Sequence, residues 1–133
     1  MLAHFSRFAR IHQALAPYRR KLFAEASQRG MPVVRHPWLH YPEEPGVVDL
    51  ELQFMLGPDF MIAPVLDPGC TEVDIWLPPG SWTDLWTGRV VESSQSQAKH
   101  RLAAPSGRPG VLYLSGSQAG EELRARLAEQ GDL

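Results

Sequence analysis

Apolar residues in the first thirty positions recur at steps of three and four, the spacing that places side chains on one face of a helix. The series runs from Phe5 to Ala26 and predicts a helix over residues 3–29. Pro17 interrupts it, because proline lacks a backbone N–H and clashes with the preceding turn. We therefore expect a kink or two abutting helices. Gly30 stands where a left-handed helix C-cap is expected.

The next segment, residues 31–39, is predicted to be extended. Val33 and Val34 form a short β-branched run without polar alternation, which favours a strand buried on both faces. A helix that leads into such a strand is typical of parallel α/β structure. A parallel strand needs neighbours on both edges, and the rest of the sequence offers none. We therefore expect this chain to be part of a larger protein.

The spacing of apolar residues along the chain changes after a proline-rich loop at residues 42–46. A short helix is expected over residues 47–56, with Val48, Leu52 and Leu56 on one face. From residue 60 onward, short apolar or alternating runs are separated by turn residues, as in an antiparallel sheet or sandwich. The expected strands are residues 60–65, 72–77, 82–86, 89–92, 99–103 and 111–114, followed by an amphipathic helix at 119–130.

Composition narrows the class of protein. An apolar fraction of 44% and a charged fraction of 21% in 133 residues are ordinary for a globular domain. The net charge of -2 gives no electrostatic case for binding nucleic acid or an anionic membrane. Cys70 is the only cysteine, so no intrachain disulfide can form. This favours a reducing compartment, and we expect a cytoplasmic protein.

Several short motifs occur in an order that resembles glycoside hydrolase family 31. They are Leu15–Tyr18, Gly30–Arg35, His40–Pro42, Gln53–Gly57, Ile62–Val65, Leu77–Trp82 and Asp84–Gly88, closed by Ala104, Pro105, Gly107 and Pro109. His40 with Tyr41, together with the short C-terminal helix, resembles the sulfoquinovosidase-like branch of the family. One departure is His36, which stands where the family commonly has proline.

This resemblance implies an α+β fragment: the end of a (β/α)8 barrel followed by an all-β antiparallel sandwich, the family's proximal C-terminal domain. Residues 1–57 would be the barrel end, residues 58–117 the sandwich, and residues 118–133 a terminal helix and tail. Residues 33–36 would form the eighth barrel strand and residues 47–56 the last barrel helix.

The resemblance also implies an α-glycosidase that hydrolyses O-glycosidic bonds. Retaining glycosidases need two carboxyl groups about 5 Å apart. In the family both are aspartates on earlier barrel strands, so we expect no catalytic residue, metal or cofactor in this chain, and no activity from it alone. Its expected partners are the remainder of the barrel and, in the complete enzyme, the carbohydrate substrate.

Barrel enzymes place their active sites at the C-terminal ends of the strands. That rule makes Arg35, His36 and Trp38 candidates for lining the substrate cleft. The structural alternative, which we favour, is that Arg35 makes an ion pair and Trp38 packs.

Two other groupings of polar residues invite a functional interpretation. Glu43 and Glu44 are a poor catalytic pair, because adjacent loop residues normally point apart. His36 and His40 would share one face only in a helix, so a metal site in this extended segment is disfavoured.

Two alternatives to a barrel fragment remain open. One is a free-standing, non-catalytic β-sandwich module that binds carbohydrate or another subunit, in which Trp76, Trp82 and Trp86 would stack on sugar rings; we favour packing for these side chains. The other is a split enzyme that reassembles from two chains. The apolar run at Val33 is expected in a barrel fragment and is unexplained in a module.

Overall fold

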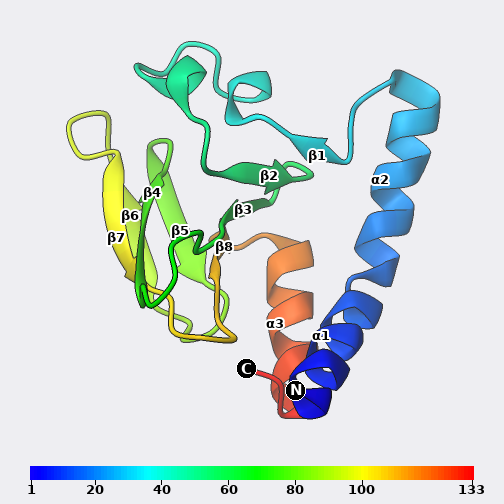
Figure 1. Cartoon of the computed structure of the whole chain (residues 1–133). Coiled ribbons are helices and arrows are strands. Elements are labelled where there is room, and N and C mark those ends of the chain that lie inside the picture. The colour runs from blue at the N-terminus through cyan, green and yellow to red at the C-terminus, as the bar shows by residue number, and fades with distance from the viewer.

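Two antiparallel sheets and three helices are arranged in layers in the computed structural model, which describes all 133 residues (Figure 1). The six-stranded sheet has the order β1-β2-β3-β8-β5-β6, and β4 and β7 form a second sheet. The elements are α1 (Leu2–Ala14), α2 (Ala16–Arg29), β1 (Val34–Arg35), η1 (Pro37–Leu39), η2 (Val47–Asp49), β2 (Phe54–Leu56), β3 (Phe60–Ala63), β4 (Glu72–Trp76), β5 (Gly80–Asp84), β6 (Val90–Ser93), β7 (Lys99–Ala103), β8 (Gly110–Leu114) and α3 (Gln118–Gln130).

The predicted N-terminal helix is two abutting helices. α1 ends before Leu15, and α2 carries Pro17 in its first turn, where the missing N–H breaks no helical hydrogen bond. Gly30 caps α2 in the left-handed conformation, with φ 72°. The break at the proline and the glycine cap are therefore confirmed. None of the three helices combines the length and apolar character needed to cross a membrane.

The helix predicted over residues 47–56 is wrong for most of its length. Only η2 is helical, and Val48 and Leu52 are 69% and 68% exposed. Residues 54–56 instead form β2, which pairs antiparallel with β3 and sets Met55 opposite Met61. Both methionines are fully buried. Pairing with β3 thus places Met55 in the core between the sheets.

The expectation that the strand at Val33 has no neighbour within this chain is also wrong. β1 has two residues and pairs antiparallel with β2, with Val34 opposite Leu56. Val34 is 57% exposed, and the other edge of β1 is the edge of the six-stranded sheet. One neighbour of β1 thus lies in this chain, because the chain returns beside it through residues 36–53.

The predicted strands after residue 60 are confirmed as strands, with ends that differ by a few residues. They enclose an apolar core between the two sheets. Its members include Trp82 of β5, Leu112 of β8 and Ile75 of β4, all fully buried. Gln53 adds a polar link, because its side-chain amide both donates to and accepts from the backbone of Trp76, at 2.8 Å each.

A second core lies between the six-stranded sheet and helices α1 and α3 (Figure 1). Leu123 and Leu127 of α3 face Phe60 and Tyr113, which confirms the predicted apolar face of the last helix. At Gly120 a Cβ atom would lie 2.2 Å from the Tyr113 ring. Glycine is therefore required for α3 to approach the sheet this closely.

The two chain ends lie side by side (Figure 1) and are joined by arginines of α1. Arg10 binds both carboxylate oxygens of Asp132, at 2.9 and 2.6 Å. Arg7 donates to the Asp132 carbonyl at 3.0 Å. The Asp132 side chain is 2% exposed, and the hydrogen bonds from Arg10 lower its pKa. This contact fixes the residues after α3 on α1.

Replacement of Asp132 by asparagine should destabilise the fold at neutral pH, with a smaller effect in acid. A lowered folded-state pKa stabilises the protein above the unfolded value of about 3.9 and ceases to do so as the pH falls through the folded value. Urea unfolding of the wild type and of Asp132→Asn, at neutral pH and below about pH 3, measures this. Asp67→Asn, at an exposed loop carboxylate, is the matched control. An equal loss of stability at both pH values would contradict the assignment.

A candidate functional site after strand β1

The turn that follows β1 is built by proline and histidine. Pro37 begins η1, where its fixed φ suits the first helical position. His36 precedes it with extended backbone, and its Nδ1 accepts a hydrogen bond from the backbone N–H of Trp38 at 3.0 Å. The other ring nitrogen, Nε2, lies 2.8 Å from the carbonyl oxygen of Leu50. His36 therefore caps the turn and ties it to the residue after η2.

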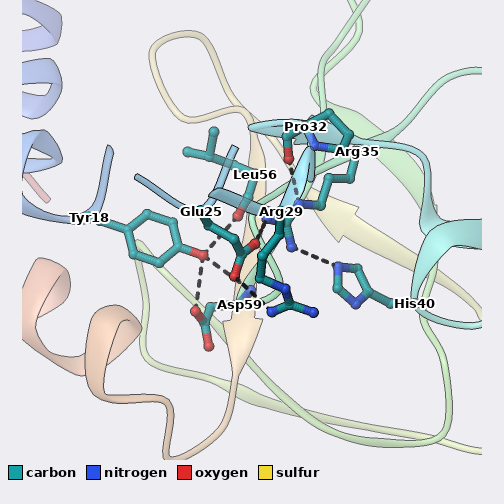
Figure 2. Close-up of polar contacts among 8 residues, drawn as sticks. All are labelled: Tyr18, Glu25, Arg29, Pro32, Arg35, His40, Leu56 and Asp59. Atoms are coloured by element: carbon teal, nitrogen blue, oxygen red, sulfur yellow. Dashed lines mark hydrogen bonds and ion pairs between the residues drawn. The ribbon is translucent and has the colours of Figure 1, made fainter. Parts of the chain in front are cut away.

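Arg35, the last residue of β1, is buried beneath this turn. It is 2% exposed, and its guanidinium contacts three groups, as Figure 2 shows. Nε donates to the Pro32 carbonyl at 2.6 Å, Nη1 lies 3.0 Å from His40 Nε2, and Nη2 forms an ion pair with Glu25 of α2. Its donors are thus directed at protein groups, as in the structural ion pair that the sequence favoured.

Of the three cleft candidates, His36 and Trp38 are exposed and Arg35 is buried, so the packing favoured for Trp38 is not found within this chain. The Trp38 side chain is 48% exposed, and the neighbouring Leu39 is 39% exposed. The structure thus divides the roles: Arg35 braces the turn from inside, His36 caps it, and Trp38 stands at the surface.

His40 closes the turn on its far side. Burial and the nearby charge of Arg35 lower the pKa of its imidazole. Both histidines of the disfavoured metal site are therefore engaged by protein groups, His36 by Leu50 and Trp38 and His40 by Arg35.

A second polar cluster, which the sequence analysis missed, lies between α2 and α3. The Tyr18 hydroxyl bonds to the Leu56 carbonyl at 3.1 Å and to Asp59 Oδ2 at 3.0 Å (Figure 2). Ser117 donates to Asp59 Oδ1 at 3.0 Å. Burial, reinforced by Asp59, raises the pKa of Tyr18. A cavity of about 350 Å³ adjoins this cluster. Both carboxylate oxygens of Asp59 accept hydrogen bonds, one from Tyr18 of α2 and the other from Ser117 at the start of α3. The cluster therefore joins these two helices to the β2–β3 turn of the sheet.

The signal that could have found this cluster was weak. Tyr18 follows Pro17 in one of the family motifs, but Asp59 is a turn residue forty-one positions away. Gly57 has φ 58°, and a Cβ atom there would lie 2.2 Å from the Tyr18 hydroxyl oxygen. The contact thus depends on a glycine in the β2–β3 turn.

The remaining candidates from the sequence have structural surroundings. Trp76, Trp82 and Trp86 are 7%, 0% and 8% exposed, so their packing is confirmed and no ring face is open to a sugar. Glu44 accepts a hydrogen bond from Gln95 at 3.4 Å, and Glu43 is exposed beside it.

Comparison with known proteins places this fold in a family. Residues 30–117 match the model described as "Glycosyl hydrolase family 31 C-terminal domain". The chain belongs to glycoside hydrolase family 31. The motifs that resembled this family thus indicated it correctly, and the matched residues form the mainly antiparallel sheet domain described above.

Relatives in family 31 are much longer than this chain. It is 37% identical to a sulfoquinovosidase of Agrobacterium fabrum and 32% identical to one of Escherichia coli. Each alignment covers 88% of this chain and 17% of the relative. Among solved structures, a family 31 sulfoquinovosidase from E. rectale in complex with an aza-sugar inhibitor superimposes with a TM-score of 0.83 at 28% identity, over 92% of this chain and 18% of that one.

Another solved relative acts on a different sugar. A family 31 α-xylosidase from a soil metagenome, complexed with xylose, superimposes with a TM-score of 0.79 at 30% identity. The superposition covers 86% of this chain and 17% of the xylosidase chain. The domain therefore recurs in family members whose names give different substrates.

Proposed function

We propose that this chain is the C-terminal portion of an α-glycosidase whose catalytic aspartates lie in a barrel outside it. The observation that carries the proposal is the match of residues 30–117 to the C-terminal domain of family 31, in a chain that spans 17% of the two curated sulfoquinovosidases. Those relatives are glycosidases by name, and retaining members need two carboxylates about 5 Å apart.

Within this proposal, residues 1–57 complete the barrel, residues 58–117 form the proximal C-terminal domain, and residues 118–133 are a terminal helix and tail. The outer edge of β1 supports a junction with further strands, because no strand of this chain covers it. Exposed apolar side chains of β1 and of the segment between β1 and β2, namely Val34, Val48 and Leu52, support burial against the barrel.

The turn after β1 is the part of this chain that we place at the substrate cleft. If β1 is the eighth barrel strand, its C-terminal end lies on the catalytic face of the barrel. Trp38 is then the contacting residue, since it is 48% exposed, and an aromatic ring offers an apolar face to a sugar. Arg35 and His36 position it without touching substrate.

We further propose a sulfoquinovosidase-like preference. It is supported by the two sulfoquinovosidases at 37% and 32% identity. His40 and Tyr41 lie in this turn, where the family resemblance placed the branch-specific pair.

Glycosidase activity should require the barrel. The pure 133-residue chain is expected to release no aglycone from aryl α-glycosides, whereas the protein extended by its upstream coding sequence should do so. An aryl α-sulfoquinovoside and an aryl α-glucoside, compared by kcat/KM, test the preference. Turnover by the chain alone would overturn the proposal, as would an upstream sequence that encodes no barrel.

A further inference from the structure

The two histidines of the turn are each restricted to one protonation form by their partners. Arginine has only N–H donors, so the 3.0 Å contact between Arg35 Nη1 and His40 Nε2 requires an unprotonated Nε2. A neutral His40 then carries its proton on Nδ1. His40 is thus an acceptor at the nitrogen that faces the guanidinium.

His36 is restricted in the opposite sense. The backbone N–H of Trp38 can only donate, so His36 Nδ1 must be unprotonated. The Leu50 carbonyl can only accept, so His36 Nε2 carries the proton and donates at 2.8 Å. The two rings are therefore neutral and in opposite tautomers, and each accepts one N–H bond.

From these contacts we propose that His36 and His40 are positioning residues that hold the Trp38 turn only while both rings are neutral. Protonation of His36 would set Nδ1–H against the Trp38 N–H and remove the cap. Protonation of His40 would set Nε2–H against the Arg35 guanidinium, and the turn would lose its contact with Arg35 of β1. The turn that presents Trp38 then opens in acid.

The charges around His40 decide how readily its contact with Arg35 is lost. His40 contacts Arg35 of β1 and feels the charges of Glu25 of α2 and Asp59 of the β2–β3 turn, and Glu25 is itself paired with Arg35 and Arg29. Burial and Arg35 outweigh the carboxylates, so the pKa of His40 is lowered. The Arg35 contact thus survives to lower pH than the reference histidine value of about 6.5 would allow.

The surroundings of His36 are different. Its two partners, the Leu50 carbonyl and the Trp38 N–H, are uncharged, and Asp49 and Glu51 flank Leu50 in the chain. Neither ring forms an ion pair with a carboxylate that would compensate protonation. Protonation of either ring therefore removes the hydrogen bond that the ring accepts, and no new ion pair replaces it.

Amide substitutions provide a matched test, because they keep the acceptor and remove the titration. Asparagine places an oxygen near the position of Nδ1 and is a good N-cap residue, and glutamine places one near Nε2. The double variant His36→Asn/His40→Gln should therefore keep the turn closed at every pH. His36→Leu/His40→Leu lacks both acceptors and should be open throughout.

The readout is hydrogen–deuterium exchange of the Trp38 amide by mass spectrometry, in the full chain, with variants compared at the same pH. At about pH 8 the wild type and the Asn/Gln variant should exchange alike, and at about pH 5 the wild type should exchange about fivefold faster, the loss of one ordinary hydrogen bond. Long-range ¹H–¹⁵N spectra should show protonated Nε2 for His36 and protonated Nδ1 for His40 at the higher pH.

Two outcomes would overturn the inference. One is equal exchange of the wild type and the Asn/Gln variant at both pH values, and the other is the reverse tautomer in either ring. The inference deepens the proposed role of Trp38 in the cleft, but exchange and spectra report the turn itself. Inactivity of the extended enzyme would contradict the proposed function but not the histidine roles. Equal exchange of the wild type and the Asn/Gln variant at both pH values would contradict the histidine roles but not the proposed function.

Discussion

Truncation of Trp82 to alanine should lower the free energy of unfolding by about 3–5 kcal/mol, the usual cost of removing a large aromatic side chain from a packed core. Trp82 is fully buried at the centre of β5, between β6 and β8. Its indole N–H also donates to the Pro78 carbonyl at 3.2 Å. The variant would therefore leave both a cavity between the two sheets and an unsatisfied carbonyl.

Urea unfolding followed by far-ultraviolet circular dichroism measures this loss. Trp38→Ala is the matched control, because it removes the same side chain where it is 48% exposed, and it should cost about 1 kcal/mol or less. Similar losses at the two positions would mean that Trp82 does not anchor the core. A small loss at Trp82 alone would also reopen the possibility of an exposed sugar-binding face on the β-domain.

Replacement of Arg35 by methionine should have the second-largest effect, about 3 kcal/mol. Methionine preserves much of the side-chain volume, so the cost arises from groups left without a partner. These are the Glu25 carboxylate, the Pro32 carbonyl and His40 Nε2. Removal of one member of a buried ion pair usually lowers the free energy of unfolding by about 3–5 kcal/mol. Because the Glu25 side chain is 29% exposed, water can partly solvate its carboxylate, and we expect a loss at the lower end of this range.

The exposed ion pair of β7 and β4 supplies the control. Arg101 contacts Asp74 at 3.0 Å, but both side chains are more than half exposed, so Arg101→Met should change stability much less. Glu25→Gln in the Arg35→Met background should add little further loss, because the interaction is already gone. Fully additive losses would show that Arg35 and Glu25 do not act as a pair.

The candidate site could be located from the sequence, but its roles could not be assigned. The position of Arg35, His36 and Trp38 after a strand followed from the barrel resemblance, and an ion pair at Arg35 was the favoured interpretation. Its partners Glu25 and His40 lie ten residues before it and five residues after it, on different elements. The pattern of apolar and polar positions along the chain does not show which polar groups the fold brings into contact. The tautomers of the two histidines depend on those contacts, so they could not be predicted either.

The sequence by itself determined the features that depend on near neighbours. The break at Pro17, the Gly30 cap, the strands after residue 60 and the last helix follow from local backbone preferences and from periodicity. The ordered motifs were sufficient to indicate family 31. Only the tertiary structure decided that residues 54–56 form a strand, that β1 pairs with β2, and that Trp82 is buried while Trp38 is exposed. These outcomes depend on which distant segments meet, because pairing with β3 outweighs the weak helical pattern of a short apolar run.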